Sequence, residues 1–139
     1  MDQKKVCLKK LVFEGGGVLG VAYCGALEEL SNRGMLCEVD TYAGTSAGSI
    51  VAALMACGAD HTFLTNEVFS VNMGNFVSYS LIKGTYNLIM KYGLCSGNEL
   101  ENWLGSLIAK LTGDKDITFL QLYNKYNKKL IITGTDIQQ

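Results

Sequence analysis

The chain has 139 residues, of which 12 are basic and 13 acidic, so its formal net charge at neutral pH is −1. This balance argues against a nucleic-acid-binding protein that neutralises phosphates with a clustered basic surface. Hydrophobic residues make up 48% and charged residues 18% of the chain, which predicts a globular fold rather than a disordered chain. The length suits one domain, and we expect a single domain over residues 1–139.

Residues 10–14 are predicted to form a short buried strand, followed by three glycines and a helix over residues 18–33 that ends at Gly34. Residues 39–43 are predicted to form a second strand. A tight GTSAG turn then leads into an apolar helix over residues 47–57. Because this helix is apolar all round, we expect it to lie buried at the centre of the fold.

A helix capped by Asp60 is predicted over residues 60–70, and an ambiguous segment follows over residues 71–95. A capping box at Ser96–Glu99 then opens a helix that ends at Gly113, and a second capping box at Thr118–Gln121 opens a short helix. The last predicted element is a strand over residues 129–135. The stretch from Phe63 to Met90, which overlaps the ambiguous segment, is rich in large apolar side chains. We interpret it as core in the first place, with a lipid-facing lid as the alternative.

This order of strands and helices predicts an α/β fold of three layers, α/β/α, with a mainly parallel sheet between the helices. Connections between parallel strands are expected to be right-handed. About three strands are predicted, and the chain stops shortly after the third. We therefore expect the fold to be incomplete at its C-terminus.

The chain contains five cysteines: Cys7, Cys24, Cys37, Cys57 and Cys95. They form neither a CxxC pair nor a zinc-ligand spacing, and their odd number excludes complete internal disulfide pairing. We interpret them as reduced thiols of a cytoplasmic chain. The amino terminus carries no apolar stretch of signal-peptide length, and the longest run of small apolar residues is far shorter than the roughly 20 residues of a membrane span.

The turn from Gly44 to Gly48 matches GxSxG, and a strand before it with a helix after it is the context of a nucleophile elbow. Glycines flank the serine because side chains there would collide with neighbouring backbone. Ser46 would then lie at a helix N-terminus, where unpaired N–H groups and the helix dipole favour a developing anion. We predict that Ser46 is a catalytic nucleophile. The alternative is an ordinary turn between a strand and a helix.

A second glycine cluster follows the first predicted strand: Gly15, Gly16, Gly17 and Gly20. Its backbone N–H groups suit an oxyanion loop. Gly15, Gly17 and Gly20 also match the GxGxxG pattern of dinucleotide-binding folds. That fold places an acidic residue at the end of its second strand, whereas Asp40 starts the second strand here. A third interpretation is a glycine turn that allows close helix packing.

The two glycine turns follow neighbouring strands, so they meet at the sheet edge where open α/β folds bind ligands. One turn offers a nucleophile and the other offers oxyanion donors. The only histidine, His61, follows the elbow helix and is expected roughly 20 Å from Ser46, at the far end of that helix. A Ser-His-Asp triad is therefore not expected, and a carboxylate is the simplest remaining base.

These motifs resemble the patatin-like phospholipase family. Residues 14–20 (EGGGVLG) resemble the family's oxyanion loop, and residues 44–48 (GTSAG) resemble its elbow. The resemblance continues more loosely through Gly93-Leu94, the helix from Glu99 and the strand ending at Thr135-Asp136. It implies a lipid acyl hydrolase of the phospholipase A or esterase type, with a Ser-Asp dyad, an acyl-enzyme that water hydrolyses, and neither metal nor cofactor.

Two departures from the family pattern affect this expectation. The family often carries Arg or Lys at the position of Leu19, and its dyad aspartate lies in an Asp-Gly-Gly or Asp-Gly-Ala motif that this chain lacks. Asp136 lies too early and precedes Ile137, so we do not assign it as the base. We expect the base to be an aspartate beyond Gln139, and this chain to be the N-terminal portion of a patatin-like domain that is inactive alone.

The resemblance also implies the partners of the site. The glycine loop (Gly15, Gly16, Gly17 and Gly20), with the N–H group of Ala47, would hold the oxyanion, while Gly44 and Gly48 shape the elbow. The expected substrate is a lipid ester at a membrane surface, and nucleic acid is not an expected partner. A dinucleotide-binding module and a catalytically inactive lipid-binding relative remain the alternatives.

Overall fold

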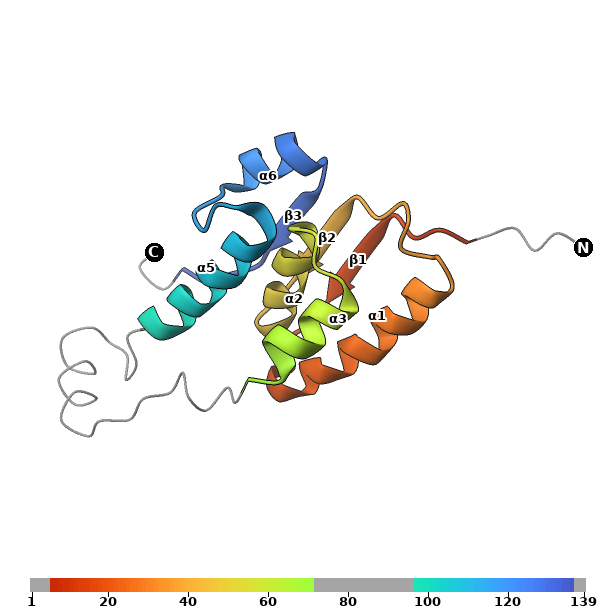
Figure 1. The fold of residues 1–139 in the computed structure, drawn as a ribbon, viewed down its shortest axis with the longest axis horizontal. Coiled ribbons are helices and arrows are strands. Elements are labelled where there is room, and N and C mark those ends of the chain that lie inside the picture. Colours follow the sequence, from red (N-terminus) through yellow and green to blue (C-terminus); the bar gives the residue numbers. More distant parts are fainter. Residues whose placement is uncertain (1–5, 72–96, 137–139) are drawn as a thin grey trace, which may run out of the picture.

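The structure is a computed structural model that describes residues 6–71 and 97–136 (Figure 1). In chain order its elements are β1 (Lys10–Phe13), the 3₁₀ helix η1 (Gly17–Val21), α1 (Ala22–Asn32), β2 (Thr41–Gly44), α2 (Ala47–Ala56), α3 (His61–Phe63), the π-helix η2 (Leu64–Phe69), α5 (Asn98–Thr112), α6 (Phe119–Tyr126) and β3 (Lys129–Ile132). The predicted α/β class is confirmed.

The three strands form a parallel sheet in the order β1-β2-β3. Their register places Phe13 beside Gly44, and Gly44 beside Ile132. The carboxyl ends of all three strands therefore meet at one edge of the sheet. The glycine loop leaves β1 at this edge, and the elbow leaves β2 at the same edge.

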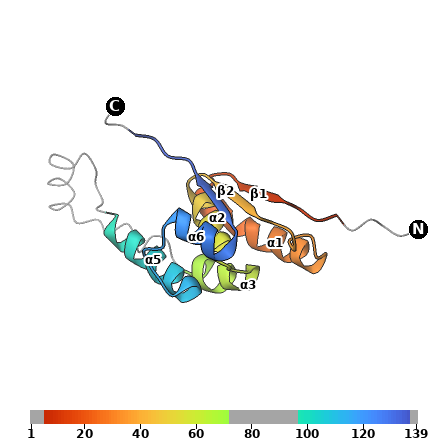
Figure 2. The same ribbon diagram turned by 90° about the horizontal axis from the view of Figure 1, so that it is seen from above.

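The helices of the described residues lie against one face of this sheet (Figure 2). The opposite face carries Val12, which is 78% exposed, and Ile131, which is 42% exposed, with Ala43 between them in the register. Parallel sheets are usually covered on both faces. The second helical layer of the expected three-layer fold is not among the residues that the structure describes. Nor does any helix in those residues have the length and apolar character needed to cross a membrane.

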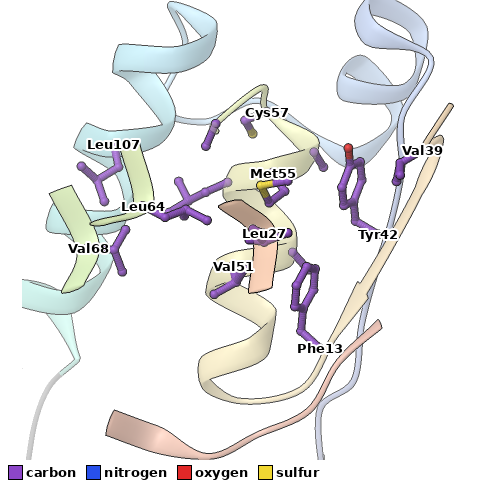
Figure 3. Close-up of a cluster of buried hydrophobic side chains, with 14 of the residues drawn as sticks. Phe13, Leu27, Val39, Tyr42, Val51, Met55, Cys57, Leu64, Val68 and Leu107 are labelled. Carbon is purple, nitrogen blue, oxygen red and sulfur yellow. The ribbon is translucent and has the colours of Figure 1, made fainter. Parts of the chain in front are cut away.

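Helix α2 forms the centre of the core, as its composition predicts (Figure 3). Residues 51–56 are all buried, and Leu54 has no exposed surface. Side chains from four other helical elements pack into the same cluster, and they are Leu27 of α1, Leu64 of η2, Leu107 of α5 and Leu122 of α6. The elbow therefore precedes the most deeply buried helix among the described residues.

The helix predicted over residues 18–33 begins differently. Gly17 has a positive φ of 54°, and the N–H group of Leu19 donates to the carbonyl of Gly16, so residues 17–21 wind as η1 before α1 begins at Ala22. In a 3₁₀ helix each N–H group donates to the carbonyl three residues earlier, so the chain winds more tightly than in an α-helix. The glycines that permit this turn were visible in the sequence, but the tighter winding was not.

The predicted helix caps had mixed outcomes. Asp60 caps α3 by accepting from the N–H group of Phe63, and Thr118 forms the predicted capping box with Gln121. The capping box predicted at Ser96 is wrong, because α5 begins after Gly97, whose left-handed backbone makes it the N-cap. In the apolar stretch interpreted as core or lid, Leu64 and Val68 are buried in the core and Phe63 and Phe69 pack against it, as the core interpretation predicts. The rest of that stretch, from residue 72 onward, lies outside the described residues.

Burial of Cys57 at the end of α2 predicts a pH dependence of stability. Burial raises the pKa of this thiol from 9.0 to about 11. Between these values the unfolded chain loses the proton and the folded chain keeps it, so the free energy of unfolding should fall as the pH rises from 9 to 11. Urea unfolding across this range should show a shallower fall for Cys57→Ala. The buried Tyr42, whose pKa burial also raises, contributes equally to the pH dependence of both proteins. Identical slopes of the free energy of unfolding against pH would therefore contradict the role of Cys57.

Candidate active site

Ser46 has the backbone geometry of a nucleophile elbow. It is the N-cap of α2, and its φ of 52° and ψ of −126° lie in a region that residues other than glycine rarely adopt. Strained backbone of this kind costs of order 1–3 kcal/mol and persists only when the surrounding structure enforces it. The N–H group of Ser49 donates to the carbonyl of Ser46 over 2.9 Å, and the Ser46 side chain is exposed at the end of the strand.

The glycines on either side of Ser46 allow this turn to form. A Cβ atom at Gly44 would overlap the backbone of Gly48 and Ser49, and a Cβ atom at Gly48 would overlap the carbonyl groups of Phe13 and Glu14. Each obstacle is backbone, so no side-chain rotation could relieve it. Glycine at position 44 is therefore a steric requirement of the turn between β2 and α2, and glycine at position 48 is a requirement of the contact between the elbow and β1.

The glycine loop lies directly against Ser46. A Cβ atom at Gly15 would stand 3.1 Å from the Ser46 Cβ and 3.8 Å from its Oγ. The absence of a side chain at Gly15 thus leaves the loop backbone beside the hydroxyl group. The structure brings together the two motifs that the sequence analysis paired at the carboxyl ends of neighbouring strands.

The other glycines of the loop have different surroundings. Gly16 and Gly17 are exposed, and no backbone group of the described residues accepts a hydrogen bond from the N–H group of Gly15, Gly16, Gly17 or Ala47. These N–H groups are consequently available to a ligand. Gly20 is buried, and a Cβ atom there would contact the ring of Phe69 at 3.4 Å. Gly20 is therefore a packing residue, which lets the loop approach Phe69 closely.

Two positioning contacts were not found by sequence reasoning. The hydroxyl of Tyr23 in α1 donates to the carbonyl of Glu14 over 2.9 Å, and its ring packs edge-on against Phe13 with centroids 5.1 Å apart. The hydroxyl groups of Thr45 and Thr133 are 2.6 Å apart and join the elbow to the end of β3. For the first contact the sequence did offer a signal, because Tyr23 lies in the predicted helix that follows the glycines. The second joins residues 88 positions apart and left no local signal.

We predict that Tyr23→Phe loosens the glycine loop. Removal of one hydrogen bond to the Glu14 carbonyl should cost about 1 kcal/mol of stability. Displacement of the loop should lower kcat for ester hydrolysis about tenfold with little change in KM, because positioning errors affect the transition state most. Tyr126→Phe, on α6, is the control and should change neither quantity. A fully active Tyr23→Phe protein would show that this hydroxyl does not position the loop.

A general base for Ser46 is not found among residues 6–71 and 97–136. No carboxylate or imidazole in these residues forms a hydrogen bond with Ser46 Oγ. His61 begins α3, and α2, which is about 15 Å long, separates it from Ser46. Asp40 precedes β2 and accepts a hydrogen bond from Thr41, so it lies at the amino end of the sheet, away from the glycine loop.

The 3₁₀ helix η1 has an apolar surface. In η1, Val18 is 77% exposed, Leu19 is 74% exposed and Val21 is 55% exposed. These three residues, which we call the η1 ridge, follow Gly17 and flank Gly20 in the sequence. A separate hollow of about 360 Å³ is lined by Asp114, Ile117 and residues of α6, and it shares no lining residue with the glycine motifs. In the described residues, no group of three or more His, Cys, Asp or Glu side chains is arranged to hold a metal ion.

Comparison with known proteins identifies relatives of most of the chain. Protein R571 of Acanthamoeba polyphaga mimivirus is 31% identical over 131 residues, which are 94% of this chain and 42% of that protein. YqhO of Bacillus subtilis is 33% identical over 104 residues, which are 70% of this chain and 35% of that protein. A shorter stretch of 50 residues, 36% of this chain and 8% of the relative, is 42% identical to the NTE family protein Rv2565 of Mycobacterium tuberculosis.

Two solved structures share the fold. The type III effector ExoU aligns with a TM-score of 0.61 at 20% identity, over 94% of this chain and 33% of that chain. The ExoU–SpcU complex of Pseudomonas aeruginosa aligns with a TM-score of 0.53 at 23% identity, over 94% of this chain and 31% of that chain. The chain thus spans less than half the length of each of these relatives. Residues 11–138 match the family described as patatin-like phospholipase, and the chain belongs to that family.

Proposed function

We propose that this protein hydrolyses acyl esters of lipids, as a phospholipase A or esterase, with Ser46 as the nucleophile. The observation that carries the proposal is the contact between the two glycine motifs, where Gly15 lies against Ser46. A strained serine at a helix N-terminus, beside a loop with available N–H groups, has the arrangement that acyl transfer requires. Membership of the patatin-like phospholipase family supports a lipid ester as the substrate.

In the proposed reaction, the Ser46 hydroxyl loses its proton to a base and its Oγ attacks the ester carbonyl. Negative charge develops on the carbonyl oxygen, and the N–H groups of Gly15, Gly16, Gly17 and Ala47 stabilise it. The tetrahedral intermediate collapses, the alcohol leaves with a proton from the base, and an acyl-Ser46 ester remains. Water, activated by the same base, then releases the fatty acid. Metal ions and cofactors have no role in this sequence of steps.

We propose that the base is an aspartate beyond Gln139, which would form a Ser-Asp dyad with Ser46. Two observations support this placement. None of the described carboxylates forms a hydrogen bond with Ser46 Oγ, and His61 lies at the other end of α2. The matched region makes up less than half of these relatives, so proteins of this family carry further sequence in which such an aspartate can lie.

The η1 ridge supports a lipid substrate. Val18, Leu19 and Val21 expose large apolar side chains immediately beside the glycine loop. Contiguous exposed apolar side chains near a reactive group are typical of sites that meet lipids or apolar partners. We propose that the protein acts peripherally at a membrane surface, with this ridge toward the acyl chains.

The proposal is tested by measuring fatty acid released from phosphatidylcholine vesicles, using the protein with whatever sequence naturally follows Gln139. We expect release of free fatty acid that Ser46→Ala abolishes. Vesicle binding without release would instead favour an inactive lipid-binding relative. Heat on titration with NAD, without release, would favour a dinucleotide-binding module. Either of the last two results would overturn the hydrolase proposal.

A further inference from the structure

Two cysteines outside the glycine motifs lie next to each other near the amino ends of β1 and β2. The Sγ atoms of Cys7 and Cys37 are 3.0 Å apart, although the residues are 30 positions apart in the sequence. Cys37 is exposed and Cys7 is half-buried. We propose that Cys7 and Cys37 form a reversible dithiol–disulfide pair, which small-molecule disulfides such as oxidised glutathione convert to a cross-link between the two segments.

The backbone on both sides of the pair is already held in place. The N–H group of Leu8 donates to the carbonyl of Met35 over 2.8 Å, and the Lys9 ammonium lies 2.8 Å from the Glu38 carboxylate. The S–S bond of a disulfide is about 2.05 Å long, so the two sulfur atoms need to approach by about 1 Å. Rotation of the two cysteine side chains can supply this movement while the flanking contacts remain.

The surroundings of the other described cysteines favour this pair as the site of oxidation. Cys57 is buried in the core, and burial raises the pKa of its thiol to about 11, which leaves very little of the reactive thiolate at neutral pH. Cys24 is half-buried in α1. Cys37 combines exposure with a second sulfur atom within reach, so its thiolate can attack a small disulfide and Cys7 can then displace the remaining half.

The proposed reaction is two thiol–disulfide exchanges. The Cys37 thiolate attacks one sulfur of oxidised glutathione, the first glutathione leaves as a thiolate, and a mixed disulfide remains. The Cys7 thiolate then attacks the Cys37 sulfur and displaces the second glutathione. The two protein thiols are oxidised, one glutathione disulfide is reduced to two glutathione thiols, and the two protons from the cysteines go to the departing thiolates.

The cross-link would lie at the amino ends of the strands, whereas Ser46 follows the carboxyl end of β2. It would close a loop that contains η1 and α1, and disulfides stabilise a fold mainly by restricting the unfolded chain. We therefore expect oxidation to raise the Tm of the chain by roughly 10 °C. Because the pair lies away from Ser46, this proposal stands independently of the proposed hydrolase activity.

The test equilibrates the chain in buffers of reduced and oxidised glutathione, traps thiols by alkylation and digests with trypsin and a Glu-specific protease. Cleavage after Glu38 separates Cys37 from Cys57, so the peptide pair that contains Cys7 and Cys37 is unambiguous by mass. We expect this linked pair, with the Tm increase, in the original chain and in the control Cys24→Ser. Cys7→Ser and Cys37→Ser should lack both.

Other results would overturn the proposal. Glutathione retained on Cys37 without a link to Cys7 would show that the two sulfurs do not meet in solution. A cross-link that involves Cys24, Cys57 or Cys95 in place of the pair would show that another thiol reacts first. A Tm increase that persists in Cys7→Ser would show that the stabilisation has another origin.

Discussion

Replacement of Ser46 by alanine is expected to lower kcat for ester hydrolysis by about 10,000-fold or more, with the fold unchanged. The size of the effect follows from the proposed role, because a nucleophile cannot be replaced by the remaining groups of the site, and residual catalysis comes from oxyanion stabilisation and binding alone. The measurement is fatty-acid release by Ser46→Ala, with circular dichroism to confirm folding. Turnover within tenfold of the unmodified protein would exclude Ser46 as the nucleophile.

Ser46→Gly separates catalysis from strain at the same position. Ser46 has a φ of 52° and ψ of −126°, and glycine adopts such backbone without a Cβ penalty. Relief of this strain should outweigh the extra entropy of glycine in the unfolded chain, so Ser46→Gly should be inactive yet more stable than Ser46→Ala by about 1 kcal/mol. Ser49→Gly, inside α2, is the comparison and should lose about 1–2 kcal/mol, because it lowers helix propensity and removes the hydrogen bond that the Ser49 hydroxyl donates to the Ser46 carbonyl. Equal stability of Ser46→Gly and Ser46→Ala would show that the elbow is not strained.

Gly48→Ala is expected to destabilise the fold by about 3 kcal/mol or more and to abolish activity. The new methyl group would overlap the carbonyl groups of Phe13 and Glu14, so α2 and β1 would have to separate. Because α2 is the central helix of the core, a shift there also disturbs the packing of the other helices. Urea unfolding measures the loss of stability, and ester hydrolysis measures the loss of function.

Gly25→Ala is the control for this prediction. Gly25 lies in α1, and a Cβ atom there would meet nothing within 4 Å. Alanine should therefore stabilise the helix by about 0.5–1 kcal/mol through its higher helix propensity. A Gly48→Ala protein as stable and active as Gly25→Ala would contradict the proposed contact between the elbow and β1.

The sequence predicted those features whose causes are local. An Ala-rich helix that is apolar all round has to be buried, and the structure places α2 at the centre of the core. The order of strands and helices predicted a parallel sheet, because parallel strands require crossover connections. The pairing of the two glycine turns was also predictable, since the carboxyl ends of neighbouring parallel strands lie at one edge.

Features that depend on the path of the chain in space were not predictable in this way. The start of α5 depends on the left-handed backbone of Gly97, and local pattern alone favoured Ser96 as the cap. The hydroxyl of Tyr23 bonds to a carbonyl nine positions earlier, and Thr45 meets a residue 88 positions later. The approach of Cys7 to Cys37 results from hydrogen bonds between their flanking segments. For the Thr45–Thr133 and Cys7–Cys37 contacts, no spacing within the sequence gives an indication.

The proposed nucleophile is tested most directly by covalent labelling with a fluorophosphonate, whose phosphorus bonds to an activated serine Oγ as fluoride leaves. The experiment uses the protein with whatever sequence naturally follows Gln139, and it follows labelling by peptide mass spectrometry and ester hydrolysis in parallel. The account predicts one adduct, on Ser46, whose formation matches the loss of hydrolysis. Hydrolysis that persists when Ser46 is fully labelled, or inhibition with the adduct on another residue, would contradict it.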